Sequence, residues 1–308
     1  MKPIVVLGPT ATGKSDLAIL LARRLGGRVI SADSVQVYRG FDIGSCKPPL
    51  AVRGVIPHHL IDVADPRDDF SAGEFARLAS QSLEDGRRRG EVSIIAGGTG
   101  LYIRALLCGI APMPPRDETL RESLYARARG PAPDDLHAEL ERADPATAGR
   151  IGRNDLQRIV RALEVVTLTG MTLSAHIRAA GFSADRLPSL KVGLTAERGE
   201  LYRRIGERVE GIFASGLVAE VEGLLSSGVP VGCNAMKALG YREVLGLLRG
   251  ETDLASTKEL VARNTRRYAK RQIAWFRREP VVHWFDVAGG QGRLEAIASE
   301  VEDLWRRE

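Results

Sequence analysis

A glycine-rich segment, Gly8-Pro9-Thr10-Ala11-Thr12-Gly13-Lys14-Ser15, follows the apolar run 4–7 near the start of the chain. This order predicts a buried strand, a phosphate-binding loop and the beginning of a helix. The glycines let backbone N–H groups close around phosphate oxygens, Lys14 adds a positive charge, and the Ser15 hydroxyl can ligate Mg²⁺ at the helix N-terminus. A glycine-rich turn that binds nothing is the structural alternative. We therefore expect an α/β protein that holds a phosphorylated compound.

The loop alone does not identify that compound. Nucleoside triphosphates are the usual ligands, but a diphosphate ester presents similar oxygens and charge. The strand predicted at 92–96 ends in glycines, whereas hydrolytic phosphate-loop proteins place an acidic residue there for Mg²⁺ and the attacking water. The sequence therefore disfavours an ATPase.

Hydrophobic patterning predicts a parallel sheet with helices on both faces. The expected strands are residues 4–7, 29–32, 92–96, 190–194 and 281–287, and the expected helices of this part are 15–25, 71–88, 197–214, 217–226, 237–248 and 256–278, the last opened by a Ser256/Glu259 capping box.

An inserted helical domain is expected at 114–187, because Pro112 to Pro115 mark a break and the residues beyond them have helical periodicity without a convincing strand. Its clearest helix is predicted to start at Asn154 as N-cap and to stop at Gly170. Residues 1–113 and 188–308 would then form the α/β core with a helical C-terminal part.

Composition narrows the class of protein. The net charge of +5 favours polyanionic partners, and three widely spaced cysteines indicate neither a disulfide framework nor a zinc site. The chain enters its first strand directly and contains no apolar run long enough to span a membrane. We expect a cytoplasmic protein with no membrane partner.

Two polar residues follow predicted strands at the edge where ligands bind in parallel sheets. Asp33 could accept a proton from a substrate or hold water on Mg²⁺, and an Asx-turn or helix cap is the structural alternative. Thr99 lies between glycines and offers a hydroxyl in the same crevice, although a plain tight turn is an equal alternative. The pair His58-His59 lacks a third ligand, so hydrogen-bonded structural roles are favoured over a metal site.

Two helices carry cationic faces that suit RNA. On the first, basic side chains recur near helical spacing beside two amides that could bond base edges or 2′-hydroxyls: Arg150, Arg153, Asn154, Gln157, Arg158 and Arg161. On the second, seven basic residues form one stripe without an acid: Arg263, Arg266, Arg267, Lys270, Arg271, Arg277 and Arg278. A solvated charged face is the structural alternative for both.

Together these motifs resemble the tRNA dimethylallyltransferase family over nearly the whole chain. Besides the phosphate loop, the resemblance rests on Asp33-Ser34-Val35-Gln36-Val37-Tyr38-Arg39-Gly40-Phe41-Asp42-Ile43-Gly44, His58-His59-Leu60-Ile61-Asp62, Gly97-Gly98-Thr99-Gly100-Leu101-Tyr102, residues 154–164, Gly240-Tyr241-Arg242 and residues 270–277. The departures are Phe41 where Met is common and Ser45-Cys46 where Thr-Ala is usual. The zinc-finger extension of some eukaryotic relatives is absent, which indicates a bacterial-type enzyme.

The resemblance implies transfer of a dimethylallyl group from dimethylallyl diphosphate to N6 of the adenosine 3′-adjacent to the anticodon, with release of diphosphate. Asp33 would take the proton from N6 and Thr99 would contact the reacting centre. The loop Gly8 to Ser15 would hold the diphosphate with Mg²⁺ on Ser15, helped by Arg208. The expected partner is the anticodon stem-loop of tRNA, and the protein is expected to be a monomer.

The same resemblance implies a set of tRNA-contacting residues: Asp33, Ser34, Val35, Gln36, Thr99, Arg121, Gln157, Arg158, Ile159, Val160, Arg161, Lys237, Gly240, Tyr241, Arg242, Lys270, Arg271, Gln272, Trp275 and Arg277.

Three other functions remain open at this point. An adenylate isopentenyltransferase shares the loop and the acid but needs neither the helical insertion nor the basic C-terminal helix, because its acceptor is a mononucleotide. A small-molecule or nucleoside kinase would use Asp33 as base towards a hydroxyl. A non-catalytic, nucleotide-regulated RNA-binding protein would consume no substrate.

Overall fold

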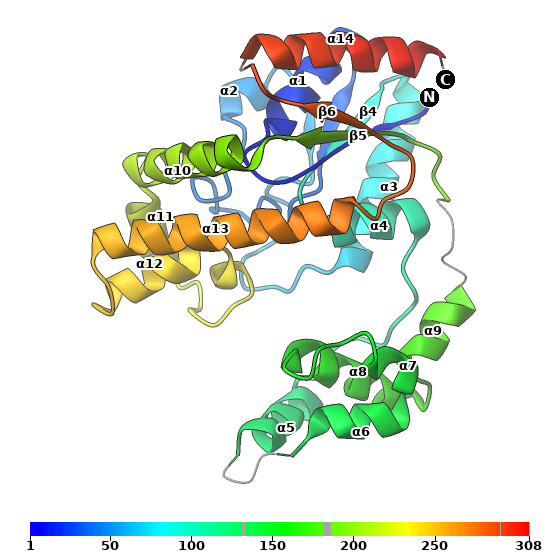
Figure 1. The fold of residues 1–308 in the computed structure, drawn as a ribbon, viewed down its shortest axis with the longest axis vertical. Coiled ribbons are helices and arrows are strands. Elements are labelled where there is room, and N and C mark those ends of the chain that lie inside the picture. The colour runs from blue at the N-terminus through cyan, green and yellow to red at the C-terminus, as the bar shows by residue number, and fades with distance from the viewer. Residues whose placement is uncertain (131–133, 181–185, 290, 308) are drawn as a thin grey trace. The chain divides into compact units, whose positions relative to one another are not determined.

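The computed structural model describes residues 1–130, 134–180, 186–289 and 291–307. The chain divides into two compact units, Met1–Leu107 with Leu187–Glu308 (unit 1) and Cys108–Arg186 (unit 2), which are coloured along the chain in Figure 1. The sequence predicts residues 114–187 for the inserted helical domain. Each unit is described by itself below.

Unit 1 is built on a six-stranded sheet whose paired strands are all parallel, in the order β3-β2-β4-β1-β5-β6. The strands are β1 (Ile4–Leu7), β2 (Arg28–Ser31), β3 (His58–His59), β4 (Ser93–Ala96), β5 (Leu190–Thr195) and β6 (Val282–Asp286). Strands β1, β2 and β4 are buried along their whole length, as expected for a parallel sheet covered on both faces. The predicted fold class is confirmed, and the short strand β3 at His58–His59 is an addition to it.

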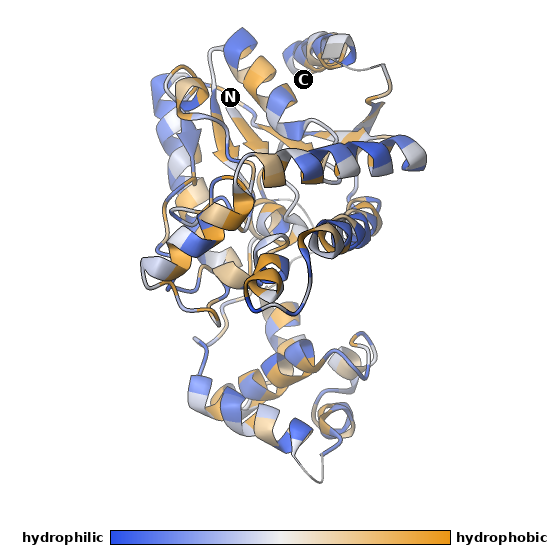
Figure 2. Ribbon diagram, turned by 90° about the vertical axis from the view of Figure 1, so that its left-hand side faces the viewer, coloured by the Kyte–Doolittle hydropathy of each residue, from blue (hydrophilic) through white to orange (hydrophobic). Residues whose placement is uncertain are grey.

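Six helices of unit 1 lie within four residues of their predicted bounds, and those at 50–53, 100–108, 235–237 and 291–307 were not predicted. The helices of this unit are α1 (Lys14–Leu25), α2 (Leu50–Arg53), α3 (Ala72–Arg89), α4 (Gly100–Cys108), α10 (Arg198–Ala214), α11 (Leu217–Ser226), the 3-10 turn η1 (Ala235–Lys237), α12 (Tyr241–Leu248), α13 (Leu254–Phe276) and α14 (Gln291–Arg307). In Figure 2 the inner strands of the sheet are mostly hydrophobic, whereas the helices of this unit alternate between hydrophobic and hydrophilic residues.

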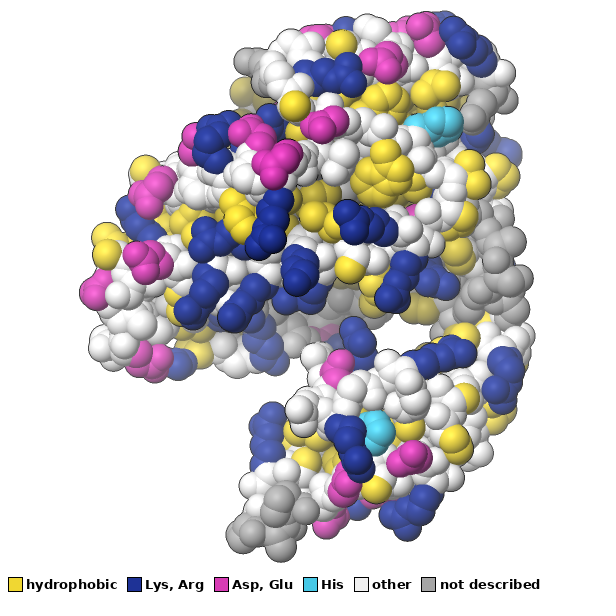
Figure 3. All heavy atoms as spheres, in the orientation of Figure 1, with side chains coloured by type: hydrophobic (Ala, Val, Ile, Leu, Met, Phe, Trp, Pro, Cys, Tyr) yellow, Lys and Arg dark blue, Asp and Glu magenta, His cyan; other side chains and the backbone are white. Residues whose placement is uncertain are grey.

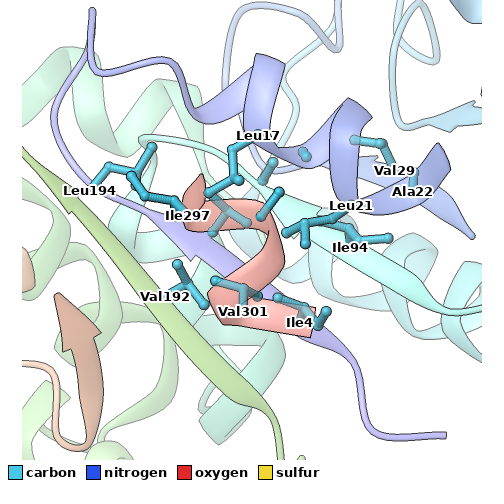
Figure 4. Close-up of a cluster of buried hydrophobic side chains, with 14 of the residues drawn as sticks. Ile4, Leu17, Leu21, Ala22, Val29, Ile94, Val192, Leu194, Ile297 and Val301 are labelled. Atoms are coloured by element: carbon cyan, nitrogen blue, oxygen red, sulfur yellow. The ribbon is translucent and has the colours of Figure 1, made fainter. Parts of the chain in front are cut away.

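A large apolar core lies between one face of the sheet and helices α1 and α14. Leu17 and Leu21 of α1 meet Ile297 and Val301 of α14 over Val192 of β5 (Figure 4). All of these side chains are fully buried. Burial of each such side chain contributes about 1.5–3 kcal/mol, so this layer fixes the strand from which the glycine-rich loop leaves.

Helix α13 packs against α10 through a smaller core that includes Leu201, Ile205, Val261 and Ala269. Its N-cap is Asp253, whose side chain accepts a hydrogen bond from Ser256 N at 2.7 Å. The predicted capping box at Ser256 and Glu259 is therefore wrong, because an acid three residues earlier already satisfies the free N–H groups of the first turn.

Unit 2 is helical in all its described elements: α5 (Glu118–Arg129), α6 (Leu136–Ala143), α7 (Pro145–Ala148), α8 (Leu156–Thr169) and α9 (Leu173–Ala180). Helix α8 stops at Gly170, as predicted, but its N-cap is Asp155 rather than Asn154. The side chain of Asp155 accepts from Arg158 N at 3.3 Å.

Within the described ranges, no helix combines the length and apolar character needed to cross a membrane.

Candidate active site

The glycine-rich loop joins β1 to α1 and has the backbone that its glycines allow. Gly8 and Gly13 have φ angles of 140° and 84°, and a Cβ atom at Gly8 would overlap the carbonyl oxygen of Leu194. Thr12 Oγ1 and Lys14 Nζ donate to Pro9 O at 2.9 and 2.6 Å. The loop is therefore closed on itself, with its N–H groups at the N-terminus of α1.

The ammonium group of Lys14 is strongly perturbed. Desolvation and the nearby positive charge of Arg208 lower the pKa of Lys14 to about 7, although the carboxylate of Asp33 opposes this shift. Arg208, on α10, forms no ion pair with any described acidic group. Lys14 and Arg208 thus lie close enough to repel each other, with the Asp33 carboxylate as an opposing charge, and an added anion would relieve this repulsion.

A cavity of about 900 Å³ opens beside this loop. Its lining includes Lys14, Ser15, Asp33, Arg208 and Gln272, which come from α1, the segment after β2, α10 and α13. A smaller cavity of about 310 Å³ is lined by residues that include Ser34, Lys237, Arg242 and Arg271. Five residues line both cavities: Thr10, Asp33, Ser45, Arg208 and Tyr268.

Asp33 uses one carboxylate oxygen for structure. Its Oδ1 accepts from Val35 N at 2.8 Å and from Gln36 N at 3.2 Å, which forms the turn that the sequence offered as the alternative to a chemical role. Among the described groups, none donates a hydrogen bond to Oδ2. The turn therefore orients the carboxylate and leaves its second oxygen at the two cavities.

Thr99 joins the segments that follow β2 and β4. Its Oγ1 accepts from Ser34 N at 3.1 Å and lies 3.4 Å from Ser34 Oγ. The glycines beside it serve packing: a Cβ at Gly98 would overlap the Gln272 carboxamide, and one at Gly100 would overlap the Trp275 indole. Thr99 itself lines neither cavity, so its side chain lies outside both.

Tyr268 is a site residue that sequence reasoning missed. It lines both cavities, and burial raises the pKa of its hydroxyl to about 12 while hydrogen bonds with Thr99 and Gln272 partly oppose that rise. Tyr268 precedes Gln272 by one helical turn, so the i, i+4 spacing on α13 could have pointed to it. The cationic stripe is the stronger sequence signal on the same helix.

Glu220 of α11 is a second missed residue. Its carboxylate accepts from the backbone N–H groups of Asp42, Ile43 and Gly44 at 3.0, 2.7 and 3.2 Å, and from the Tyr241 hydroxyl at 2.6 Å. It fixes the segment that carries Ser45, which lines both cavities. No local pattern reveals this contact, because the partners lie far apart in the sequence.

Part of the predicted tRNA-contacting set is buried. Ile159 and Val160 belong to the core of unit 2, and Tyr241 and Gly240 are buried in unit 1. Three polar members are also buried and already paired: Gln36 with Ser31 and Ser45, Arg121 with Glu164, and Gln272 with Thr10 and Gly98. These side chains therefore do not lie on the outer surface, although Gln36 and Gln272 line the larger cavity, and their contact with tRNA stays a prediction.

Other members of that set are accessible. Gln157, Arg158, Lys237, Arg242, Lys270, Arg271, Trp275 and Arg277 are exposed, and Ser34 and Val35 are half-buried. Arg161 is half-buried, with its guanidinium bonded to Glu164 at 2.6 Å and to Pro114 O at 2.8 Å.

The seven basic residues of the predicted stripe form one cationic face along the C-terminal half of α13 and just after it, since Arg277 and Arg278 follow the last helical residue, Phe276. None of them makes an ion pair with an acidic group in the described ranges, whereas most arginines elsewhere do, such as Arg127, Arg203 and Arg306. Figure 3 shows this row of Lys and Arg side chains along α13. Such a face attracts a polyanion.

Among the described residues, no group of three or more His, Cys, Asp or Glu side chains could hold a metal ion. His58 Nδ1 instead lies 2.6 Å from Ile56 O, a structural hydrogen bond.

The fold and this site define a parallel α/β protein with a cavity of about 900 Å³ beside a glycine-rich loop at the carboxyl edge of its sheet. Comparison with known proteins narrows this class. Residues 36–279 match the family model described as IPP transferase, and residues 1–56 match the one described as isopentenyl transferase. The chain belongs to the IPP transferase family.

Its relatives match this chain over nearly its whole length. A tRNA dimethylallyltransferase of Geobacter metallireducens is 47% identical over 97% of this chain and 96% of its own. The solved full-length tRNA isopentenylpyrophosphate transferase of Bacillus halodurans is 36% identical with a TM-score of 0.72, covering 98% of this chain and 96% of that one. A solved eukaryotic dimethylallyltransferase acting on tRNA is 26% identical with a TM-score of 0.81, covering 100% and 80%. The family and the transferase class predicted from the sequence are confirmed.

Proposed function

We propose that this protein transfers a dimethylallyl group from dimethylallyl diphosphate to N6 of the adenosine 3′-adjacent to the anticodon of tRNA and releases diphosphate. The observation that carries the proposal is the meeting of two cavities at Asp33, one beside the cationic loop and one beside the basic face of α13. Relatives named tRNA dimethylallyltransferase support the same activity.

The larger cavity suits the donor. A diphosphate would accept hydrogen bonds from the N–H groups of the loop and neutralise Lys14 and Arg208, which both line this cavity. Binding the leaving group with charge in a partly desolvated cavity also favours departure of diphosphate.

The smaller cavity suits the acceptor base. An adenine placed against Asp33 would lose one N6 proton to Oδ2 as the bond between N6 and C1 of the donor forms and the bond between C1 and the diphosphate oxygen breaks. An exocyclic amine is a weak nucleophile, so the reaction depends on an activated allylic carbon and a fixed leaving group. The base must leave its stack to reach this cavity.

Mg²⁺ fits the same site as an ion shared with the substrate. Magnesium usually takes one or two protein ligands, keeps several waters and binds substrate phosphates. Ser15 lines the larger cavity and would be the protein ligand. When bound, the ion would neutralise charge on the diphosphate.

The RNA surface is assigned to the exposed cationic residues of α13, to Lys237 and Arg242, and in unit 2 to Gln157 and Arg158. Because the proposed substrate is a tRNA, we also propose that the protein acts in the cytoplasm. The family resemblance leads us to propose in addition that it is a monomer.

The proposal is tested by giving the purified protein Mg²⁺, ATP, dimethylallyl diphosphate and unmodified tRNA, alone and in pairs. We expect consumption of dimethylallyl diphosphate only with tRNA, and mass spectrometry should find the added group on the adenosine after the anticodon. Transfer to free AMP, ADP or ATP would instead identify an adenylate isopentenyltransferase. Transfer of the ATP γ-phosphate without use of the allylic donor would identify a kinase.

A further inference from the structure

The side chain of Gln272 links two loops that are distant in the sequence. Thr10 N, in the glycine-rich loop, donates to Gln272 Oε1 at 2.9 Å. Gln272 Nε2 donates to Gly98 O at 2.9 Å, in the loop that follows β4. An N–H group can only donate and a carbonyl oxygen can only accept, so these two partners fix the orientation of the carboxamide.

The link is tight. Gln272 is 5% exposed, and a Cβ atom at Gly98 would overlap its Nε2. Tyr268, one helical turn before Gln272 on α13, lines both cavities. Neither loop could shift against the other without breaking one of these bonds and leaving a buried polar group unpaired.

The two loops carry different parts of the site. The first contains Lys14 and the N–H groups assigned to the donor diphosphate. The second contains Thr99, which accepts from Ser34 N beside Asp33. A change in their separation would therefore move the donor relative to the acid that accepts the proton.

We propose that Gln272 is a positioning residue that holds the glycine-rich loop and the Gly97–Gly100 loop at the separation needed for group transfer. This inference rests on the proposed function. It assigns Gln272 to alignment within the site, in place of the RNA contact expected from the sequence. Because misplacement by about 1 Å can slow a reaction about 10²-fold, loss of Gln272 should reduce the rate of transfer far more than the affinity for either substrate.

Two variants separate alignment from general stability. Gln272→Met keeps the approximate size and loses both hydrogen bonds. Gln272→Glu keeps an acceptor for Thr10 N, but its ionised form cannot donate to Gly98 O. Protonation of that carboxyl restores a donor, and burial against a carbonyl oxygen should raise its pKa.

The first measurement is the single-turnover rate at saturating donor and tRNA, expressed relative to the wild type at each pH. We expect Gln272→Met to be slower by about 10- to 100-fold at every pH. Gln272→Glu should be equally slow at about pH 8 and should recover as the pH falls towards about 5.5. Gln81→Met, on the exposed face of α3, is the matched control and should match the wild type.

The second measurement does not depend on catalysis. Hydrogen exchange at the Thr10 amide, followed by NMR, should be slow in the wild type, fast in Gln272→Met and slow in Gln272→Glu. The inference would be overturned if Gln272→Met had the single-turnover rate of the wild type. It would also be overturned if the rate of Gln272→Glu relative to the wild type did not change with pH. A wild-type protein that fails to modify tRNA would overturn the proposed function, and the exchange measurement would then still test the link itself.

Discussion

The two carboxylate oxygens of Asp33 have different surroundings, and a single substitution can separate them. In Asp33→Asn the amide oxygen still accepts from Val35 N and Gln36 N, so the turn should persist, but no group remains to take the N6 proton. We expect turnover to fall by about 10² to 10⁴, the range for a positioned general base, with tRNA affinity within about threefold of the wild type.

The control is Asp253→Asn, because Asp253 caps α13 through a similar contact and lies outside both cavities. Single-turnover rates that are equal in Asp33→Asn and the wild type would leave Asp33 with its structural role alone.

The lowered pKa of Lys14 predicts a pH-dependent affinity for the donor. Below a pH of about 7 the ammonium is charged in the free protein, and above it the amine is mostly neutral. A bound diphosphate favours the charged form, so binding at about pH 8 should take up a proton and should weaken as the pH rises further.

Calorimetry with a non-reactive dimethylallyl diphosphate analogue, in two buffers of different ionisation enthalpy, measures this uptake. Lys14→Met should bind more weakly and lose the part of the uptake that belongs to Lys14. Equal proton uptake by both proteins would contradict the assignment.

Sequence reasoning at the scale of single residues succeeded where the signal is local. The glycine-rich loop and the turn at Asp33 could be predicted because each depends on a few adjacent residues. The roles of Gln272 and Glu220 could not be predicted, because their partners are separated from them by 174 to 262 residues and by 176 to 178 residues. Burial likewise decides whether a residue of a helical motif faces RNA, as Ile159 and Val160 show.

At the scale of secondary-structure elements, α13 combines an apolar face, the site residues Tyr268 and Gln272, and an unpaired cationic face. Each cation that contacts a phosphate releases a counterion, which adds about 0.7 to 0.9 to the slope of log K against log salt. We therefore expect Arg271→Ala with Arg277→Ala to weaken tRNA binding and to lower that slope by about 1 to 2.

The matched control is Arg87→Ala with Arg88→Ala. It removes the same net charge from the end of α3, where both arginines pair with Glu84 and Asp85 on their own helix. Binding of the donor analogue should be unchanged in both double variants. An unchanged salt slope in the α13 variant would mean that this face is only solvated.

Helix α8 shows that the interior of unit 2 also depends on charge. Glu164 is fully buried and accepts from Asp117 N at 2.8 Å, Arg121 at 3.3 Å and Arg161 at 2.6 Å. Glu164→Ala would leave the buried guanidinium of Arg121 without its partner, which costs about 3–5 kcal/mol.

Hydrogen exchange in α5 and α8 of the full chain should therefore become much faster in Glu164→Ala, while exchange in the sheet of unit 1 stays as in the wild type. Arg153→Ala, which removes an exposed pair with Asp135, is the control and should change little. Unchanged protection of α5 in Glu164→Ala would show that the buried pair is dispensable.

On the scale of the whole molecule, the pattern of strands and helices predicted most of unit 1, because a buried parallel sheet demands apolar runs at fixed spacing. The patterns were not sufficient for β3, which is two residues long, and α14 was not predicted although it completes the apolar core on one face of the sheet. The unit boundary at Cys108 was not recognised either, because the sequence break at Pro112 to Pro115 lies within unit 2.

Unit 2 is inserted into unit 1 between two residues that lie next to each other in unit 1. Leu187 N donates to Leu107 O at 3.1 Å, so the ends of the insertion are adjacent. Among the described residues, none of unit 2 belongs to the two apolar cores that support the sheet and α13, and none lines either cavity. Replacement of residues 108–186 by a glycine–serine linker of about four residues should therefore leave unit 1 folded.

We expect this shortened protein to bind the donor analogue within about threefold of the full chain, because the larger cavity is complete without unit 2. Its affinity for an anticodon stem-loop should fall by about tenfold or more, with a smaller salt slope, since the cations of unit 2 would no longer reach phosphates. Circular dichroism and thermal unfolding check the fold, and titrations at several salt concentrations measure both affinities. Full RNA affinity in the shortened protein would confine the RNA surface to unit 1, and loss of donor binding in a folded protein would contradict the independence of the cavity.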